Sequence, residues 1–259
     1  MSMDPQQGYA GRIALVTGGR GVIGSAVTGA LRARGAAVVC ADSEGTLDGA
    51  HADAQALAAT TLRLDVTDRA AIAALVARIE QLLGPVDLLV NVAGVVSFGS
   101  AQDLAEAEWD RVMAINLKGS FLACQAVMAG MKRAGFGRII NIGSVVGKNA
   151  GNARPWIDSA EQQRAGNVAY GVSKAGIHAM TGFLAKELAA HGITVNAIAP
   201  GPIATPMTTS FPEQLKALIP AGRMGTAADI ANAALFLAAR ESSFITGEVM
   251  DINGGMLCD

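Results

Sequence analysis

The sequence predicts a doubly wound α/β fold, in which a mainly parallel sheet is covered by helices on both faces within a single domain. Short apolar runs alternate with helical patterns along the whole chain, and the first run ends in a glycine-rich loop. Parallel strands must be joined by crossovers, which helices provide, so this alternation favours a parallel sheet. We expect about seven strands, and no linker or internal repeat divides the 259 residues.

The first apolar run, Arg12–Thr17, leads into a glycine loop, and a helical pattern follows as far as Gly35. A glycine loop between a strand and a helix lets the backbone approach a pyrophosphate closely, while the start of the helix offers free N–H groups. The sequence therefore predicts a dinucleotide site formed by Gly18, Arg20, Gly21, Val22, Ile23 and Gly24.

The second apolar run, Ala36–Ala41, is followed by Asp42. An acid at this place can bind the ribose diol of an adenosine, and its charge would repel the additional phosphate of NADP. Asp42 therefore predicts NAD as the cofactor. Arg20 leaves an NADP(H) alternative open, because a cation in the glycine loop could meet a 2′-phosphate.

Two further strands are expected at Thr61–Leu64 and Val86–Val90, with a helix at Arg69–Leu83 between them. In a doubly wound sheet the carboxyl ends of the strands face the ligand crevice. Residues just beyond these strands should line the cofactor site, although Asp65 could equally cap a helix. They are Asp65, Val66, Asn91, Ala93 and Gly94. Later strands are expected at Arg138–Ile142, at Thr194–Ile198 and near Gly247–Ile252.

Tyr170 and Lys174 open a long apolar-periodic stretch that predicts a helix to Ala190, and a second long helix is expected at Trp109–Met131. At this spacing the two side chains lie on one helical face. A cation beside a phenol favours the phenolate, so we expect the pKa of Tyr170 to fall below its usual ~10. Such a tyrosine could transfer protons near neutral pH. The same pair is also common on helix surfaces, so it indicates catalysis only together with the cofactor site.

Composition and charge exclude several other classes of protein. The net charge of −2 gives no electrostatic reason to expect nucleic acid or an anionic membrane as a partner. Cys40, Cys124 and Cys258 are scattered, as in a reducing compartment. No apolar leader is seen and no run is expected to reach membrane-spanning length, so we expect a cytoplasmic protein. The three histidines form no cluster with other ligands, so no metal is expected.

These motifs together resemble the short-chain dehydrogenase/reductase family over essentially the whole chain. The loop spacing TGxxGxxG is that of the family's extended branch, whereas the chain length and later motifs fit its short, single-domain branch. The segment 145–168 is longer than is usual and should form an enlarged loop beside the substrate mouth. The matching segments are Thr17–Gly24, Asp65–Asp68, Asn91–Gly94, Asn116, Ile142–Ser144, Tyr170–Lys174, Asn196–Pro202, Gly222–Gly225, Ile245–Gly247 and Asn253–Gly255.

The resemblance implies a catalytic set of Asn116, Ser144, Tyr170 and Lys174. In it Tyr170 is the general acid and base, Ser144 fixes the substrate oxygen, and Asn116 holds a water that passes protons to Lys174. Lys174 also binds the nicotinamide ribose. The nicotinamide end should further be held by Pro200, Gly201, Ile203 and Thr205, next to a mobile lid at about 204–224.

Substrate contacts are expected from Val96, Ser144, Arg154, Trp156, Tyr170 and Met207. The enlarged loop could instead make an oligomer contact or a plain surface excursion. The resemblance also implies a homotetramer.

The expected function is that of an NAD(H)-dependent alcohol dehydrogenase or ketone reductase acting on a small molecule. Two alternatives stay open: an NADP(H)-dependent carbonyl reductase, and a non-catalytic dinucleotide-binding regulator. The complete catalytic set disfavours the regulator, because a protein that only binds the cofactor needs none of it. The sequence does not identify the substrate.

Overall fold

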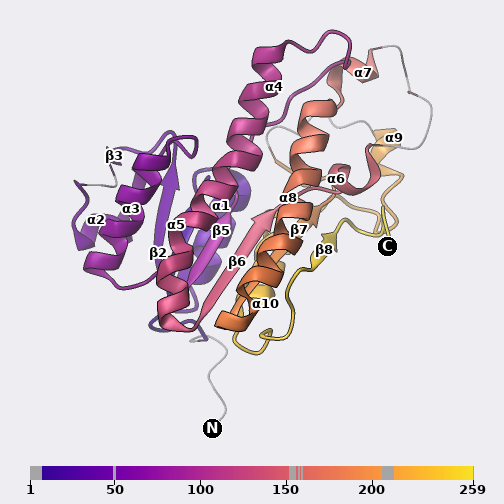
Figure 1. Ribbon diagram of the computed structural model, residues 1–259. Helices are drawn as coiled ribbons and strands as arrows, with labels where there is room; N and C mark the ends of the chain where they lie inside the picture. The colour runs from indigo at the N-terminus through magenta and orange to yellow at the C-terminus, as the bar shows by residue number, and fades with distance from the viewer. Residues whose placement is uncertain are drawn as a thin grey trace.

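The protein is built on one parallel sheet that runs through the centre of the molecule (Figure 1). The computed structural model describes residues 8–48, 51–151, 156, 158, 160–205 and 213–258. Within these residues the strand order is β3-β4-β2-β1-β5-β6-β7-β8, and every neighbouring pair is parallel. The strands are β1 Ile13–Thr17, β2 Ala37–Asp42, β3 Leu47–Asp48, β4 Thr61–Arg63, β5 Leu88–Asn91, β6 Gly137–Ile142, β7 Ile193–Pro200 and β8 Val249–Ile252. The predicted doubly wound fold is confirmed.

The sheet has one strand more than predicted. Among the described residues it contains eight strands, because β3 pairs with β4 at the edge of the sheet. β3 comprises only Leu47 and Asp48, both exposed, and two residues are too few to produce a recognisable strand pattern.

Helices cover both faces of the sheet (Figure 1). One face carries α1 Val22–Arg32 and α10 Ala227–Ala238, and the other carries α3 Arg69–Leu82, α5 Gly119–Ala134 and α8 Val168–Leu188. Shorter helices are α2 Ala54–Ala59, α4 Glu106–Val112, α6 Val146–Asn149, α7 Glu161–Arg164 and α9 Glu213–Lys216. Segment 145–168, expected as a loop, thus contains α6 and α7, and α9 lies within the segment expected as a lid.

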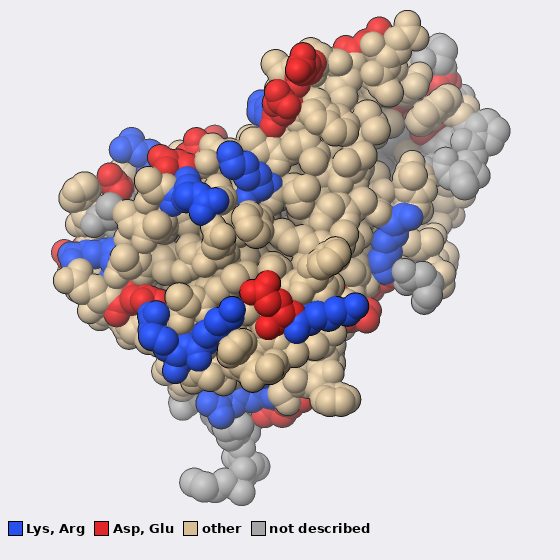
Figure 2. Space-filling model, in the orientation of Figure 1, with Lys and Arg blue, Asp and Glu red and all other residues tan. Residues whose placement is uncertain are grey.

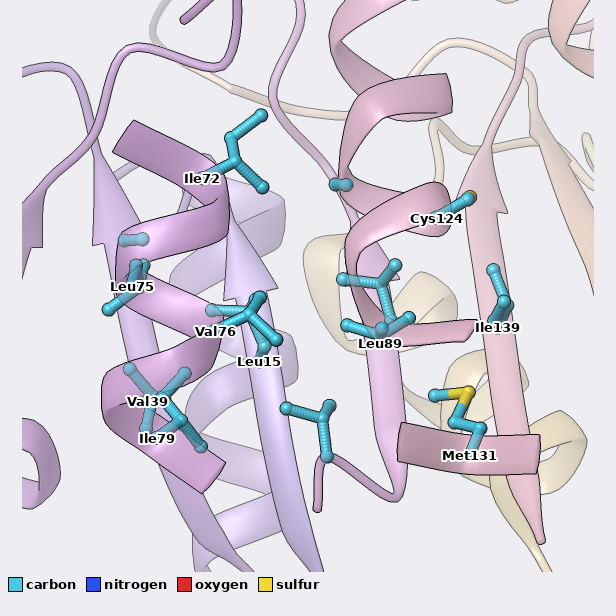
Figure 3. Close-up of a cluster of buried hydrophobic side chains, with 14 of the residues drawn as sticks. Leu15, Val39, Ile72, Leu75, Val76, Ile79, Leu89, Cys124, Met131 and Ile139 are labelled. Carbon is cyan, nitrogen blue, oxygen red and sulfur yellow. The ribbon is translucent and has the colours of Figure 1, made fainter. Parts of the chain in front are cut away.

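The alternation of side chains along the strands creates two separate cores. In β1, Leu15 faces the layer of α3 and α5, whereas Ala14 and Val16 face α1 and α10. Figure 3 shows the first core, in which Leu15 of β1 lies beside Val76 of α3 and Leu89 of β5 lies on the side of Ile139. Each fully buried side chain of this size contributes roughly 2 kcal/mol, so the two cores fix the sheet from which the site residues extend.

The helix predicted at Trp109–Met131 extends further in both directions. A π-helical turn at Met113–Lys118 joins α4 to α5, so the helical stretch runs from Glu106 to Ala134. This stretch is long and apolar enough to cross a membrane by length and composition, so the expectation that no run reaches that length is wrong. Its buried face packs on β5 and β6, as the core helix of a soluble protein does.

Candidate active site

The glycine loop wraps tightly around the start of α1. Gly18 has φ +67°, and a Cβ atom there would lie 2.5 Å from the backbone nitrogen of Ala93, so only glycine fits. A Cβ atom at Gly24 would collide with the carbonyl oxygen of Gly18. The N-cap of α1 is Gly21, which has no side chain to bond the first N–H groups. These groups are therefore available to an anion such as a pyrophosphate.

Asp42 lies at the end of β2, next to this loop. Its carboxylate accepts hydrogen bonds from the backbone N–H of Arg20 at 3.0 Å and from that of Glu44 at 3.1 Å. The Arg20 side chain turns toward Glu44, where Nη1 donates to the backbone oxygen at 3.2 Å and Nε lies 3.9 Å from the carboxylate. Asp42 thus holds the backbone of Arg20, while Glu44 holds its guanidinium.

A pocket of about 510 Å³ extends from the glycine loop along the carboxyl ends of β1, β2, β4 and β5. It brings together ten of the residues predicted to bind the cofactor, from segments far apart in the sequence. Those ten are Gly18, Gly21, Val22, Ile23, Asp42, Asp65, Val66, Ala93, Gly94 and Thr205. Asp65 also accepts hydrogen bonds from the backbone and hydroxyl of Thr67, both at 2.8 Å, while Asp68 is the residue that caps α3.

Several other residues predicted for the cofactor do not line this pocket. The side chain of Asn91 is buried and donates to Asn141 Oδ1 at 2.9 Å, so it joins β5 to β6 inside the core. Ile203 is buried and pairs with Gly225. The remaining residues predicted for the cofactor that lie outside the lining are Arg20, Gly24, Tyr170, Lys174, Pro200 and Gly201.

Ser144, Tyr170 and Lys174 meet at the carboxyl end of β6. Ser144 follows this strand, and its side chain interacts with that of Tyr170, which lies in the first turn of α8. Lys174 is one turn further along and donates from Nζ to the carbonyl oxygen of Ile142 at 2.7 Å. The same Nζ is 3.5 Å from the position that a Cβ atom of Gly94 would occupy. The three side chains are therefore next to the residues that line the pocket.

The protonation states differ from the expectation. Burial raises the pKa of Tyr170 above its usual value, and the interaction with the Ser144 side chain only opposes this rise. Burial also lowers the pKa of Lys174 to about 8. The prediction that Lys174 lowers the pKa of Tyr170 is therefore wrong here. Nζ lies 5.8 Å from the centroid of the phenol ring, so removal of the phenol from water outweighs its attraction.

Asn116 is fully buried in the π-helical turn, a type of helix irregularity that is frequent at functional sites. Its side chain accepts from the Val95 N–H at 2.8 Å and donates to the Val95 carbonyl at 2.9 Å. The same amide donates to Ser173 Oγ at 3.0 Å. The asparagine therefore holds the chain beyond β5 against α8, so its predicted link to a water is not needed to explain its burial.

The residues predicted to contact substrate are only partly described. Val96 is half-buried beyond β5, and Trp156 is 51% exposed. Arg154 and Met207 lie outside the described residues.

Sequence reasoning missed some residues of the site. The additional pocket residues Ser43, Leu64, Val92, Val95 and Ile115 each lie beside a predicted position, so extending each strand end by a residue or two would have found most of them. His178 is one helical turn beyond Lys174, and its Nε2 accepts from the N–H of Ser144 at 3.4 Å. Its spacing from Lys174 is the only signal of this contact in the sequence.

Known proteins share both the sequence and the fold. A family model described as enoyl-(acyl carrier protein) reductase matches residues 19–257. The 3-oxoacyl-[acyl-carrier-protein] reductase FabG of Escherichia coli (strain K12) is 41% identical over 255 residues, which cover 96% of this chain and 98% of that protein. FabG of Thermotoga maritima is 39% identical over 254 residues, with 95% and 98% covered. The crystal structure of gox2181 has a TM-score of 0.81 at 31% identity, covering 97% of this chain and 98% of that one.

Proposed function

The chain belongs to the short-chain dehydrogenase/reductase family, and from this premise we propose that it is an NAD(H)-dependent oxidoreductase interconverting a ketone and a secondary alcohol. The observation that supports this best is the meeting of Ser144, Tyr170 and Lys174 next to the glycine loop. Two hydroxyl groups can hydrogen-bond one carbonyl oxygen, and one of them can give it a proton. A protein that only bound a dinucleotide would not need this arrangement.

Family members bind a nicotinamide dinucleotide, and the pocket suits one. The close approach of Gly18 to Ala93 and the uncapped start of α1 leave room and N–H donors for a pyrophosphate. Asp42 is proposed to bind the ribose diol, and Thr205, which also lines the pocket, is proposed to bind the nicotinamide carboxamide. When bound, this cofactor supplies or accepts the hydride.

Tyr170 is proposed as the proton donor in ketone reduction and as the proton acceptor in alcohol oxidation. Burial raises its pKa, so the phenol is protonated at neutral pH, which is the form that can donate to a carbonyl oxygen. Ser144 would hydrogen-bond the same oxygen and hold it at the phenol.

Lys174 is proposed to support the oxygen anion of Tyr170 after the proton has left. Its ammonium group donates to Ile142, which leaves N–H groups for the cofactor ribose and for Tyr170. Asn116 would contribute by fixing Val95 at the pocket and, as the family resemblance implies, by joining Lys174 to solvent through a water.

NAD(H) is proposed rather than NADP(H) because of charge. A 2′-phosphate beside Asp42 would meet its carboxylate and that of Glu44, and Arg20 is already engaged with Glu44. NADP(H) remains the alternative, in which Arg20 would have to leave Glu44 and bind the phosphate.

The names of the relatives suggest a class of substrate. A 3-oxoacyl thioester carries a ketone, so a compound of this class is the first substrate to test. Val96 and Trp156 are proposed to contact it, together with Arg154 and Met207. A trans-2-enoyl thioester tests the chemistry in the name of the family model.

We also propose a cytoplasmic homotetramer. The outer faces of α5 and α8 leave a broad, largely uncharged area exposed (Figure 2). It contains a groove lined by Met113, Leu117, Phe121 and Met180, with Asp110 and Lys118 also in the lining. Phe183 extends this area and is 78% exposed. Phe236 and Phe244 are exposed on and beyond α10, on the opposite layer. Two apolar areas on opposite layers suit the pairing of copies around two axes, and light scattering at micromolar concentration should give the mass of four chains.

The function is tested by mixing the purified protein with NADH or NADPH and a panel of ketones, including a 3-oxoacyl thioester. We expect ketone-dependent oxidation of NADH at a kcat/KM above that with NADPH. A higher value with NADPH would favour the carbonyl reductase alternative. Reduction of the enoyl thioester alone would overturn ketone chemistry, and cofactor binding without any turnover would support the regulator.

A further inference from the structure

Asn167 caps the helix that carries Tyr170. Its side chain is buried, and Oδ1 accepts from the backbone N–H of Ala169 at 3.1 Å and from that of Tyr170 at 3.3 Å. An N-cap of this kind determines where a helix begins and how its first turn is oriented. Because Tyr170 is the third residue of α8, its position depends directly on this cap.

The other half of the same amide binds the loop beyond β5. Nδ2 of Asn167 donates to Ser97 Oγ at 2.8 Å and to the carbonyl oxygen of Phe98 at 3.1 Å. The backbone N–H of Asn167 also donates to the Ser97 carbonyl at 2.9 Å. The side chain therefore uses both acceptor sites on the helix and both donors on the loop, which is all that an asparagine amide offers.

A second connection joins this loop to α8 beyond Tyr170. Asn116 holds Val95 and donates to Ser173 Oγ, and this hydroxyl donates to the carbonyl oxygen of Tyr170 at 2.8 Å. Asn167 and Ser173 stand three residues before and three after Tyr170. The helical segment around the phenol is thus tied on both sides to the loop Val95–Phe98, whose first residue lines the pocket.

We propose that Asn167 is a positioning residue that fixes Tyr170 relative to the loop Val95–Phe98, and hence relative to a substrate held between them. The inference rests on the proposed function and deepens it. Serine or aspartate would cap α8 equally well, but neither can donate to Ser97 and Phe98 while accepting from the helix. The need for both actions explains an asparagine here, since proton transfer demands well-placed partners.

The test separates the cap from the tether with two variants. Asn167→Ser keeps an N-cap acceptor but is too short to reach the loop, whereas Asn167→Ala loses both. If Asn167 positions Tyr170, kcat for ketone reduction falls about tenfold to a hundredfold in both variants, while the KM for the cofactor stays close to that of the wild type. The midpoint temperature of thermal unfolding should fall clearly in Asn167→Ala only.

Hydrogen exchange measured by mass spectrometry gives a second result that does not depend on activity. In Asn167→Ser, amides in 95–99 should exchange faster than in the wild type, whereas amides in 168–175 should keep their protection. Asp53→Ser is the matched control, because Asp53 caps α2 through the Ala56 N–H and touches neither element. It should leave both segments and kcat unchanged.

If Asn167→Ser has the kcat and the exchange pattern of the wild type and only Asn167→Ala is impaired, Asn167 is a helix cap and the proposal is overturned. Faster exchange in 95–99 with unchanged kcat would also overturn it, since the tether would then not position the phenol. A wild type that reduces no ketone refutes the proposed function instead, and in that case unchanged exchange in 95–99 would still refute the tether.

Discussion

Two buried pairs of a cation and a tyrosine lie at opposite ends of β6. At the amino end, Arg138 is 3% exposed and Tyr9 is 7% exposed, and each affects the ionisation of the other. At the carboxyl end, Lys174 is 5% exposed and donates to Ile142, the last residue of the strand, beside Tyr170. Burial raises the pKa of both tyrosines, to about 12 for Tyr9.

The two pairs differ in how fully their hydrogen-bonding groups are used. Arg138 donates to the carbonyls of Gly137, Gly192 and Ala239, and the Tyr9 hydroxyl donates to that of Leu235. Lys174 has three donors but, among the described residues, a single hydrogen-bonded carbonyl. Burial and a neighbouring cation therefore do not identify a catalytic tyrosine. The carboxyl end differs because, among the described residues, Lys174 uses one of its three N–H donors and lies next to a pocket.

The largest effect is expected from removing one hydroxyl at each end. Tyr170→Phe should reduce kcat by ~10²–10⁴, because general acid–base catalysis is worth about that much, while cofactor binding and unfolding stay close to the wild type. Tyr9→Phe should lower the unfolding free energy by about 1 kcal/mol through the lost bond to Leu235 and leave kcat unchanged. Steady-state kinetics and urea unfolding measure both. A near-normal kcat in Tyr170→Phe would refute the proposed mechanism, and with it the functional difference between the two tyrosines.

The second effect concerns the buried cations. The pKa of Lys174 is lowered from 10.5 to about 8, so between these values the unfolded chain binds more protons. Stability due to this group therefore rises with pH in that window. Between pH 8 and 10.5, the free energy of unfolding of the wild type should rise by up to roughly 3 kcal/mol relative to that of Lys174→Met. Activity of the variant should be lost.

The control at the other end is Arg138→Met. This substitution leaves buried carbonyls without donors. It should lower the free energy of unfolding by several kcal/mol, about 1–3 for each unpaired group. A guanidinium stays charged over the same window. The difference in unfolding free energy between Arg138→Met and the wild type should therefore not change between pH 8 and 10.5. Parallel stability curves for wild type and Lys174→Met would contradict the ammonium's burial.

Most strands, and the site residues just beyond their carboxyl ends, can be predicted from the sequence, because apolar runs and the residues that follow them are local patterns. Gly18, Asp42, Ala93 and Thr205 meet at one pocket as the order of parallel strands requires. No prediction covers α10, which is apolar at nearly every position, or the two-residue β3. The local sign of α10 is the capping box of Thr226 and Asp229 at its start.

Other features depend on contacts that no local pattern encodes. The pKa of Tyr170 follows from its burial by distant segments, which a pairwise argument from Lys174 leaves out. The tie between Asn167 and Ser97 joins residues 70 positions apart. The cluster around Arg138 draws on Tyr9, Ala239 and Gly192, and it carries no motif.

The third effect compares two aspartates that both accept backbone hydrogen bonds. At the carboxyl end of the sheet, Asp42 accepts from the backbone N–H groups of Arg20 and Glu44. Asp42→Ala should raise the ratio of kcat/KM for NADPH to that for NADH by about tenfold, equivalent to about 1.4 kcal/mol. At the amino end, Asp87 pairs with Arg12 at 2.7 Å and accepts from Ile13, so Asp87→Ala should change stability but not this ratio. An unaltered ratio in Asp42→Ala would place the ribose elsewhere.

The smallest effect is expected at Phe136, which serves the amino end alone. The guanidinium carbons of Arg12, Arg138 and Arg240 lie 4.1, 4.4 and 5.4 Å from its ring centroid. Arg12 and Arg240 also lower the pKa of Arg138, so the cations repel one another, and the negative face of the ring offsets part of this repulsion.

Phe136→Leu keeps most of the apolar volume and removes the ring, so it should cost about 1–2 kcal/mol. Combined with Arg240→Gln in a double-mutant cycle, it should give a coupling energy of ~0.5–1 kcal/mol, as at an exposed site. The kcat should not change in any of these variants, because the ring is separated from Tyr170 by the length of β6. A zero coupling energy would mean that Arg240 stands near the ring without being stabilised by it, and a fall in kcat would mean that the two ends of the strand are not independent.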